Sequence, residues 1–294
     1  MSASEIEVIV EQLRANPIGG GSLEEMRAGM DETAVPVAED INVQAIDIDG
    51  IPCELYTPPG ADTKRVIMFT HGGGFLVGSL ISHRAMISEL ARASGCQALA
   101  VEYRLSPEHA FPAALDDATA AYLWLLKNGY SPDKIAFSGD SAGAGLTIGT
   151  LVSLRDSNQP LPAAVVCLSP WIDLEVTGES HISRKDLDPM ITSDILTQMG
   201  QAYIGAGDIK SPSASPINAD LTGLPPLLIQ VGSAETLFSD SERLAQNAQS
   251  GGVEVILEEW PDMVHVWHMF FPQLADARKA ISRAGEFVKD KLGA

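Results

Sequence analysis

The sequence predicts an α/β protein with a mostly parallel sheet that helices cover on both faces. Short apolar runs of strand length recur along the chain from about residue 41. Segments with helical periodicity stand between most of these runs. Continuous apolar runs of this kind are typical of parallel strands buried on both faces, and their alternation with helices indicates a layered α/β domain.

The first two predicted strands form a hairpin, so the sheet is expected to begin with an antiparallel pair. The runs INVQAIDID and CELYT flank Asp49-Gly50-Ile51-Pro52, a turn-forming stretch. The further strands are predicted at 66–70, 97–103, 134–138, 163–169, 227–232 and 253–259. Helical patterns lie between most of these strands and after the last, for example at 112–128, 142–156, 239–250 and 272–290.

Two regions depart from the alternation. Residues 1–40 precede the sheet, with Pro17 and Gly19-Gly20-Gly21 between two helical stretches. Residues from about 175 to 223 form a long insertion with a helical pattern at about 193–204. Long connections in α/β domains often act as lids or binding loops. We therefore predict N-terminal cap helices in 1–40 and a main domain in 41–294 with a cap insertion; packing decoration without a lid role is the alternative.

Composition narrows the classes of partner. The chain has 294 residues, 45% of them hydrophobic, as in an ordinary globular protein with a sizeable core. Its formal net charge of −20 disfavours nucleic acid, since Lys and Arg supply most of that affinity. The same charge disfavours anionic membrane surfaces and anionic substrates. A small neutral substrate is expected.

The cysteines and the N-terminal residues indicate the cellular compartment of the protein and whether it binds a metal. Cys53, Cys96 and Cys167 are odd in number and widely spaced, which argues against a disulfide framework or a zinc site, and no metal or cofactor is predicted. The N-terminal stretch has acids where a signal peptide has basic residues, and no apolar run approaches the length that spans a bilayer. The sequence thus predicts a cytoplasmic protein without stable membrane insertion.

A G-x-S-x-G pentapeptide, Gly139-Asp140-Ser141-Ala142-Gly143, carries the first chemical signal. A strand precedes it and a helix follows, so its glycines permit a sharp turn that exposes the Ser141 hydroxyl. The helix N-terminus would direct N–H groups at negative charge forming beside the serine. The alternative is a glycine-rich turn needed only for tight helix–sheet packing.

A second signal, His71-Gly72-Gly73-Gly74-Phe75, follows the strand at 66–70. A dinucleotide loop would need an acid about 20 residues on at a strand end, and none is well placed. A P-loop is excluded because no Gly-Lys-Ser/Thr occurs. The glycines instead allow backbone N–H groups to face a reacting oxygen, with the Ala142 N–H converging from the other side, as an oxyanion hole requires.

A serine nucleophile needs a base to accept its proton, and His265 is the preferred candidate. It lies just after the predicted strand at 253–259, on the same sheet edge as Ser141. His268 is close by, but its surroundings are partly apolar and indicate packing.

The acid that orients the base is then expected between the serine and the histidine, where Glu235 and Asp240 follow the strand at 227–232. Ser239 and Glu242 have the spacing of a capping box, which would make Asp240 a first-turn acid favoured by the helix dipole. Glu235 has no such structural explanation. We predict Glu235 as the acid and keep Asp240 as the alternative.

Over roughly residues 40–290 the chain resembles the hormone-sensitive-lipase-like (bacterial family IV) esterases of the α/β-hydrolase superfamily. The motifs that carry the resemblance are HGGGF (71–75), YRLSPEH (103–109) with FPAA (111–114), GDSAG (139–143) and SPWIDL (169–174). It implies the α/β-hydrolase fold, a cap built from N-terminal helices and a later insertion, and oxyanion donors at Gly72, Gly73 and Ala142. The usual acid in this family is Asp, so Glu235 is a departure that some similar members share.

Together these features predict a serine carboxylesterase that hydrolyses short- to medium-chain esters through an acyl-enzyme, the chain length being implied by the resemblance. Ser141, His265 and Glu235 would form the catalytic triad. An amidase or carbamate hydrolase with the same triad is one alternative. A non-catalytic ligand-binding protein is another, although such relatives have lost the histidine that stands here as His265. The sequence does not determine the oligomeric state, a homodimer among the options.

Overall fold

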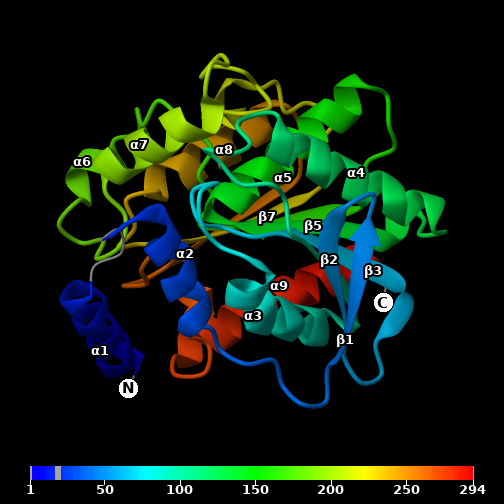
Figure 1. The fold of residues 1–294 in the computed structure, drawn as a ribbon, viewed down its shortest axis with the longest axis horizontal. Coiled ribbons are helices and arrows are strands. Elements are labelled where there is room, and N and C mark those ends of the chain that lie inside the picture. The colour runs from blue at the N-terminus through cyan, green and yellow to red at the C-terminus, as the bar shows by residue number, and fades with distance from the viewer. Residues whose placement is uncertain (1, 17–20, 294) are drawn as a thin grey trace.

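A twisted sheet runs through the protein with helices on both faces (Figure 1). The structure, a computed structural model, describes residues 2–16 and 21–293. Within them the sheet has eight strands in the order β1-β2-β4-β3-β5-β6-β7-β8. The strands are β1 (Asn42–Ile48), β2 (Ile51–Thr57), β3 (Asp62–Thr70), β4 (Cys96–Val101), β5 (Ile135–Asp140), β6 (Ala164–Leu168), β7 (Leu227–Gly232) and β8 (Val255–Trp260).

Strand directions confirm the predicted mixed sheet. β1 pairs antiparallel with β2, and β2 pairs antiparallel with β4. Every other neighbouring pair, from β4–β3 to β7–β8, is parallel. The carboxyl ends of the six parallel strands therefore meet at one edge, where loops from distant parts of the sequence come together.

The central strand β3 shows why the sheet needs helices on both faces. Its side chains alternate between two core clusters, with Val66 and Met68 in one and Ile67 and Phe69 in the other. All four are buried. A strand that is apolar on both sides is stable only between two helical layers.

The covering helices form those two layers (Figure 1). On one face α3 (Leu80–Ser94) packs with α9 (Ala275–Lys291). On the other face lie α4 (Ala113–Lys127), α5 (Ser141–Asp156) and α8 (Phe238–Ser250). Helix α3 was not among the helices predicted from sequence. Its buried face includes polar residues such as Ser82, His83 and Ser88, which weakens the apolar periodicity.

The helices outside these layers lie at the left in Figure 1. They are α1 (Ser2–Ala15), α2 (Leu23–Glu32), the short α6 (Ser180–Ser183) and α7 (Ser193–Ile204). The first two belong to the N-terminal segment and the other two to the insertion. The predicted linker residues Pro17, Gly19 and Gly20 lie outside the described residues.

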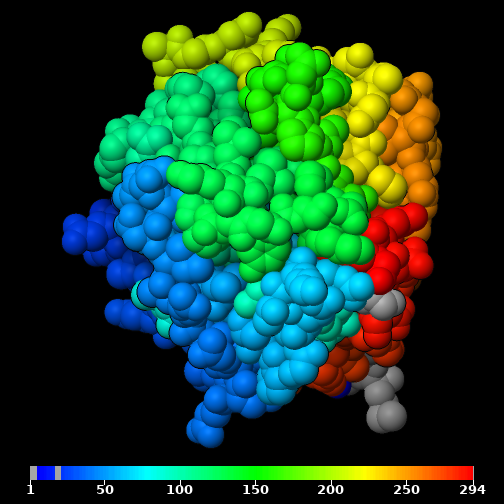
Figure 2. All heavy atoms as spheres, turned by 90° about the vertical axis from the view of Figure 1, so that its right-hand side faces the viewer, coloured from blue at the N-terminus to red at the C-terminus, as the bar shows by residue number. Residues whose placement is uncertain are grey.

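At the opposite end of the molecule, segments that are far apart in the sequence contact one another. Figure 2 shows early, middle and late parts of the chain side by side on that face. Lys134 donates to the carbonyl of Leu292 at 2.9 Å, and Arg65 donates to the carbonyl of Gly293. The end of the last helix is thereby tied to β3 and to the turn before β5.

Three further observations concern the cysteines, metals and membranes. Cys53, Cys96 and Cys167 are buried and carry free thiols. Among the described residues no group of three or more His, Cys, Asp or Glu side chains could hold a metal ion. No helix in the described parts of the chain is both long and apolar enough to cross a bilayer.

Candidate active site

Ser141 stands on a sharp turn between β5 and α5. It is the first residue of the helix and has a φ of 53°, in the left-handed region where a non-glycine residue is strained. Gly143 lets the turn lie against β3, because a methyl group there would come within 2.1 Å of the Thr70 carbonyl oxygen. This geometry is that of a nucleophile elbow.

His265 brings its ring to the Ser141 hydroxyl, with Nε2 2.9 Å from Oγ. It lies in the loop after β8, and 3% of its surface is exposed. His268, the alternative base, instead bonds through Nε2 to Gln230 Oε1 at 2.9 Å. Burial lowers the pKa of His268 to about 3, so its ring is neutral and part of the core.

Glu235 lies on the other side of the His265 ring. Its Oε2 is 3.0 Å from His265 Nδ1, and the residue is fully buried. Its Oε1 accepts from the Gly232 N–H at 2.6 Å and from the Ser169 hydroxyl at 2.7 Å. Ser169 Oγ also accepts from the Val266 N–H at 3.1 Å. Both carboxylate oxygens are therefore held in place.

This arrangement decides the protonation of the His265 ring. A carboxylate only accepts hydrogen bonds, so the Nδ1 beside Glu235 carries the proton and Nε2 is free to accept from Ser141. Burial alone would lower the pKa of His265. The hydrogen bond and charge of Glu235, with the charges of Asp188 and Asp140, instead raise that pKa above its ordinary value.

Asp240, the alternative acid, does not contact His265. Its Oδ2 accepts from the N–H groups of Ile172 and Asp173 at 3.0 and 3.1 Å, and its Oδ1 lies 3.2 Å from His181 Nε2. Asp240 and His181 thus form another buried histidine–carboxylate pair, between α8 and the insertion.

The predicted capping box in front of α8 is wrong. The helix begins at Phe238, after Leu237, and no side chain caps it. Ser239 Oγ instead lies 2.6 Å from Ser180 Oγ and accepts from the Ser180 N–H at 3.3 Å. A serine of the insertion has replaced the local partner, a tertiary contact that sequence spacing does not reveal.

The glycine-rich loop after β3 lies beside the serine and requires one correction. The Gly72 N–H already donates to Asp140 Oδ1 at 3.0 Å, so it is not free to face a substrate oxygen as predicted. Among the described residues no hydrogen bond is formed by the N–H groups of Gly73 and Gly74. A methyl group on Gly73, whose φ is 107°, would come within 2.2 Å of the Val77 carbonyl oxygen. The loop therefore requires glycine there.

Asp140 joins this loop to Ser141, a role that the variable position of G-x-S-x-G did not suggest. Besides Gly72 it contacts His83, whose Nε2 lies 3.4 Å from Oδ2. Burial alone would raise the pKa of Asp140, but His83, His71 and the Gly72 N–H hold it below its usual range. The loop is further fixed by Tyr103, which donates to the His71 carbonyl at 2.7 Å and stacks on its ring.

The N-terminal segment and the insertion both contact this region. Met199 of α7 lies against the glycine loop, since a methyl group on Gly74 would be 2.1 Å from its sulfur. Tyr203 of α7 stacks on Phe75, with ring centroids 3.6 Å apart. Arg27 of α2 donates to the carbonyl of Leu76 at 2.8 Å. The two segments that departed from the α/β alternation thus meet the loop beside Ser141.

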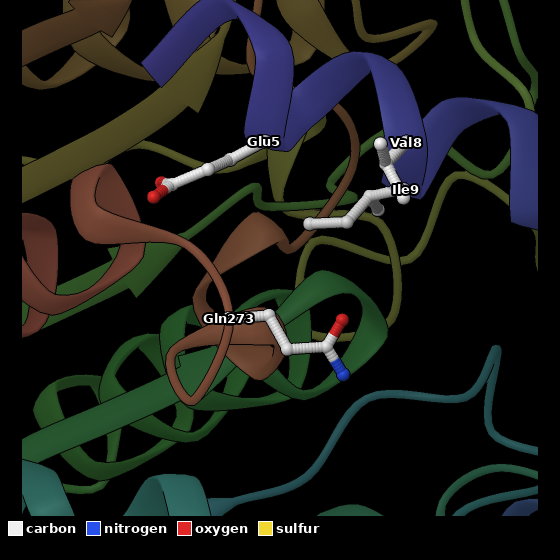
Figure 3. Close-up of a pocket in the computed structure, with 4 residues that line it drawn as sticks. All are labelled: Glu5, Val8, Ile9 and Gln273. Carbon is white, nitrogen blue, oxygen red and sulfur yellow. The ribbon is translucent and has the colours of Figure 1, made fainter. Parts of the chain in front are cut away.

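A surface hollow of about 350 Å³ lies elsewhere, against α1. Figure 3 shows Glu5, Val8 and Ile9 on α1 standing above Gln273. Glu5 is engaged by the Ala275 N–H at 2.9 Å. With mainly apolar walls and no set of convergent polar groups, the hollow does not compete with Ser141 as a site of chemistry.

Comparison with known proteins agrees with this fold. The family described as "alpha/beta hydrolase fold" matches residues 67–269. The chain belongs to the α/β-hydrolase family. Within this family it is similar to an acetyl-hydrolase of Streptomyces hygroscopicus, with 40% identity over all of this chain and 99% of that protein.

Solved structures of α/β-hydrolases indicate which branch of the family this chain resembles. An esterase of the bacterial hormone-sensitive lipase family is 42% identical, with a TM-score of 0.96 over 99% of both chains. EstE5, whose crystal was soaked with p-nitrophenyl butyrate, is 43% identical, with a TM-score of 0.95 over 99% of both chains. The resemblance to hormone-sensitive-lipase-like esterases predicted from the sequence motifs is confirmed.

Proposed function

We propose that the protein is a carboxylesterase that hydrolyses small neutral esters through an acyl-enzyme on Ser141. The observation that carries the proposal is a continuous buried line from Ser141 Oγ to His265 Nε2 (2.9 Å) and from His265 Nδ1 to Glu235 Oε2 (3.0 Å). Nucleophile, base and orienting acid in this geometry characterise serine hydrolases. The esterase and acetyl-hydrolase names of the relatives support the same activity.

In the first half-reaction Ser141 Oγ attacks the ester carbonyl carbon while His265 Nε2 accepts the hydroxyl proton. The tetrahedral intermediate collapses as the bond to the alcohol oxygen breaks, and His265 returns its proton to that oxygen. The alcohol leaves and the acyl group remains on Ser141. Glu235 stabilises the imidazolium that forms during both proton transfers.

In the second half-reaction water attacks the acyl carbon and gives a proton to His265 Nε2. The bond between the acyl carbon and Ser141 Oγ then breaks, His265 returns the proton to Oγ, and the carboxylic acid is released. The same three residues serve both halves of the cycle.

The oxyanion is proposed to accept from the N–H groups of Gly73, Gly74 and Ala142. Gly74 replaces Gly72 in this set because the Gly72 N–H is bonded to Asp140. Each such donor contributes on the order of 10²–10³ in kcat in serine hydrolases. The helix N-terminus of α5, on which Ala142 lies, adds a favourable dipole.

We propose that residues 1–40 and 175–223 form a cap over this site. Support comes from Met199 and Tyr203 of the insertion against the glycine loop and from the bond between Arg14 and the Asp186 carbonyl, at 3.1 Å, which joins the two segments. Short to medium acyl chains are the expected substrates, as the family resemblance implies, and the net charge of −20 favours neutral ones.

The direct test is Ser141→Ala, assayed with a p-nitrophenyl ester series from acetate to decanoate. We expect kcat to fall by at least about 10⁴-fold, because the nucleophile is lost while the fold remains. An organophosphate should label Ser141 in the unmodified protein and not in the variant. A variant that keeps most of its esterase activity, with a circular dichroism spectrum like that of the parent, would refute the proposal.

The amidase alternative is tested with matched leaving groups. p-Nitrophenyl butyrate and p-nitrobutyranilide present the same butyryl group as an ester and as an amide. We expect the ester to be turned over much faster. If the anilide is turned over faster, the proposed activity changes from esterase to amidase, and the proposed roles of Ser141 and His265 stay the same.

A further inference from the structure

The loop that carries Glu235 is covered by the insertion. Thr236, the next residue, donates its N–H to Asp188 Oδ2 at 2.8 Å and its hydroxyl to the Ile191 carbonyl at 2.9 Å. Its own carbonyl accepts from the Ser180 hydroxyl at 2.6 Å. Thr236 is fully buried, so these contacts take the place of hydrogen bonds from its N–H, hydroxyl and carbonyl groups to water. The position of Glu235 therefore depends on residues more than 40 positions earlier in the chain.

Asp188 is the charged residue of this contact. It is 7% exposed, and three backbone N–H groups donate to its carboxylate. Those of Met190 and Ile191 reach Oδ1 at 2.9 and 3.0 Å and fix the turn of the insertion itself. The third is that of Thr236. A carboxylate can only accept, so this set of donors matches its ionised form.

The charge of Asp188 also acts on His265. Glu235 and Ser141 bond to the ring of His265, and the charges of Asp188 from the insertion and Asp140 from the turn at Ser141 act on it. His268, from the same loop as His265, is neutral. Burial alone would lower the pKa of His265. The bond to Glu235 raises it most, and the negative charges of Glu235, Asp188 and Asp140 add to the rise.

We propose that Asp188 is a positioning residue for the Glu235–His265 pair: its carboxylate fixes the loop on which Glu235 stands, and its charge favours the protonated imidazole formed during the reaction. Asp188 touches no reacting atom and acts through Thr236 and the local field. It lies in the insertion, so this segment would serve catalysis as well as cover the site. The inference rests on the proposed function, in which Glu235 and His265 act together.

The test compares Asp188→Asn with Asp194→Asn. Both variants remove one negative charge from the same insertion, but Asp194 is exposed in the first turn of α7. In Asp188→Asn we expect kcat per active site to fall roughly tenfold, the scale of one charge-assisted hydrogen bond. The acidic limb of the kcat/KM profile should move to lower pH, since a less stabilised imidazolium loses its proton more readily. Asp194→Asn should match the parent in both.

Asp188→Glu separates charge from shape. It keeps the negative charge while lengthening the side chain. The midpoint of the acidic limb of its kcat/KM profile should therefore stay close to that of the parent even if kcat falls. Active sites are counted by organophosphate titration. The limb midpoint does not depend on how many molecules fold, so a poorly folding variant still gives a result.

The outcomes for Asp188 and for the proposed function are distinguishable. The inference is overturned if the acidic limb of the kcat/KM profile of Asp188→Asn has the same midpoint as that of the parent, whatever the loss in kcat. A purely structural role of Asp188 would leave this midpoint in place. Glu235→Gln is measured in parallel. If Glu235→Gln keeps the parent kcat, the proposed triad fails independently of Asp188.

Discussion

Two of the buried histidine–carboxylate pairs in this protein have acids that are only five positions apart in the chain. Glu235–His265 and Asp240–His181 are both buried, with nitrogen–oxygen distances of 3.0 and 3.2 Å. The pairs differ at the far nitrogen of each ring. His265 Nε2 meets the Ser141 hydroxyl, whereas His181 Nδ1 has no hydrogen-bond partner in the described part of the chain.

The two carboxylates differ as well. The second oxygen of Glu235 accepts from the N–H of Gly232, the last residue of β7, and from the hydroxyl of Ser169, the residue after β6. Asp240 accepts from the N–H groups of Ile172 and Asp173, in the loop that leads into the insertion. A buried histidine–carboxylate pair is therefore not in itself a catalytic unit. The group on the other side of the ring distinguishes an acid–base pair from an anchor.

The largest expected effect separates the two histidines. In His265→Gln, kcat should fall by roughly 10⁴-fold or more, because no base remains for Ser141. In His181→Gln, kcat per active site should stay within about twofold, since the His181 ring bonds to Asp240 and not to Ser141. Both are measured with p-nitrophenyl butyrate after active-site titration. A comparable loss of kcat in folded His181→Gln would make the second pair part of the catalytic machinery.

The two acids should separate in a different way. Glu235→Ala should lower kcat by roughly 10³- to 10⁴-fold, since His265 loses the group that sets its tautomer. Asp240→Ala should instead lower the free energy of unfolding by about 2–4 kcal/mol, because two backbone N–H groups and His181 lose their acceptor in the core. Urea unfolding and titrated kcat measure the two effects. The assignment is reversed if Asp240→Ala alone loses kcat while remaining folded.

The smallest effect concerns the pH dependence of kcat/KM. The reaction needs His265 neutral, so activity falls as pH drops through its pKa. The contacts of His265 hold that pKa above its ordinary value, so the midpoint of the acidic limb should lie above pH of about 6.5. Glu235→Gln should move it to lower pH by more than Asp188→Asn does. A midpoint well below 6 in the parent protein would contradict this picture.

Local sequence pattern was sufficient to predict most of the sheet and the sharp turn at Ser141. Strands such as β3 are apolar on both faces, and the glycine-rich turn at Ser141 follows a strand and opens a helix. These are properties of short segments, so they can be read from a single sequence. The choice of Glu235 over Asp240 as the neighbour of His265 rested partly on a capping box that the structure does not contain, although the contact between Glu235 and His265 agrees with the choice.

What sequence reasoning missed depends on contacts between distant segments. The Gly72 N–H is engaged by Asp140, 68 residues later, which removes it from the predicted oxyanion donors. Ser239 pairs with Ser180 rather than capping its own helix. Ser169 and Asp188 hold the Glu235 loop from other parts of the chain. No periodicity or motif spacing encodes such partners, so only the folded structure reveals them.

Asp140 has a mechanical consequence. Its backbone is joined directly to Ser141, and its side chain grips the Gly72 N–H. Ser141, the proposed nucleophile, and the glycine loop proposed to receive the negative charge are thus joined through one residue, by a peptide bond on one side and a hydrogen bond on the other.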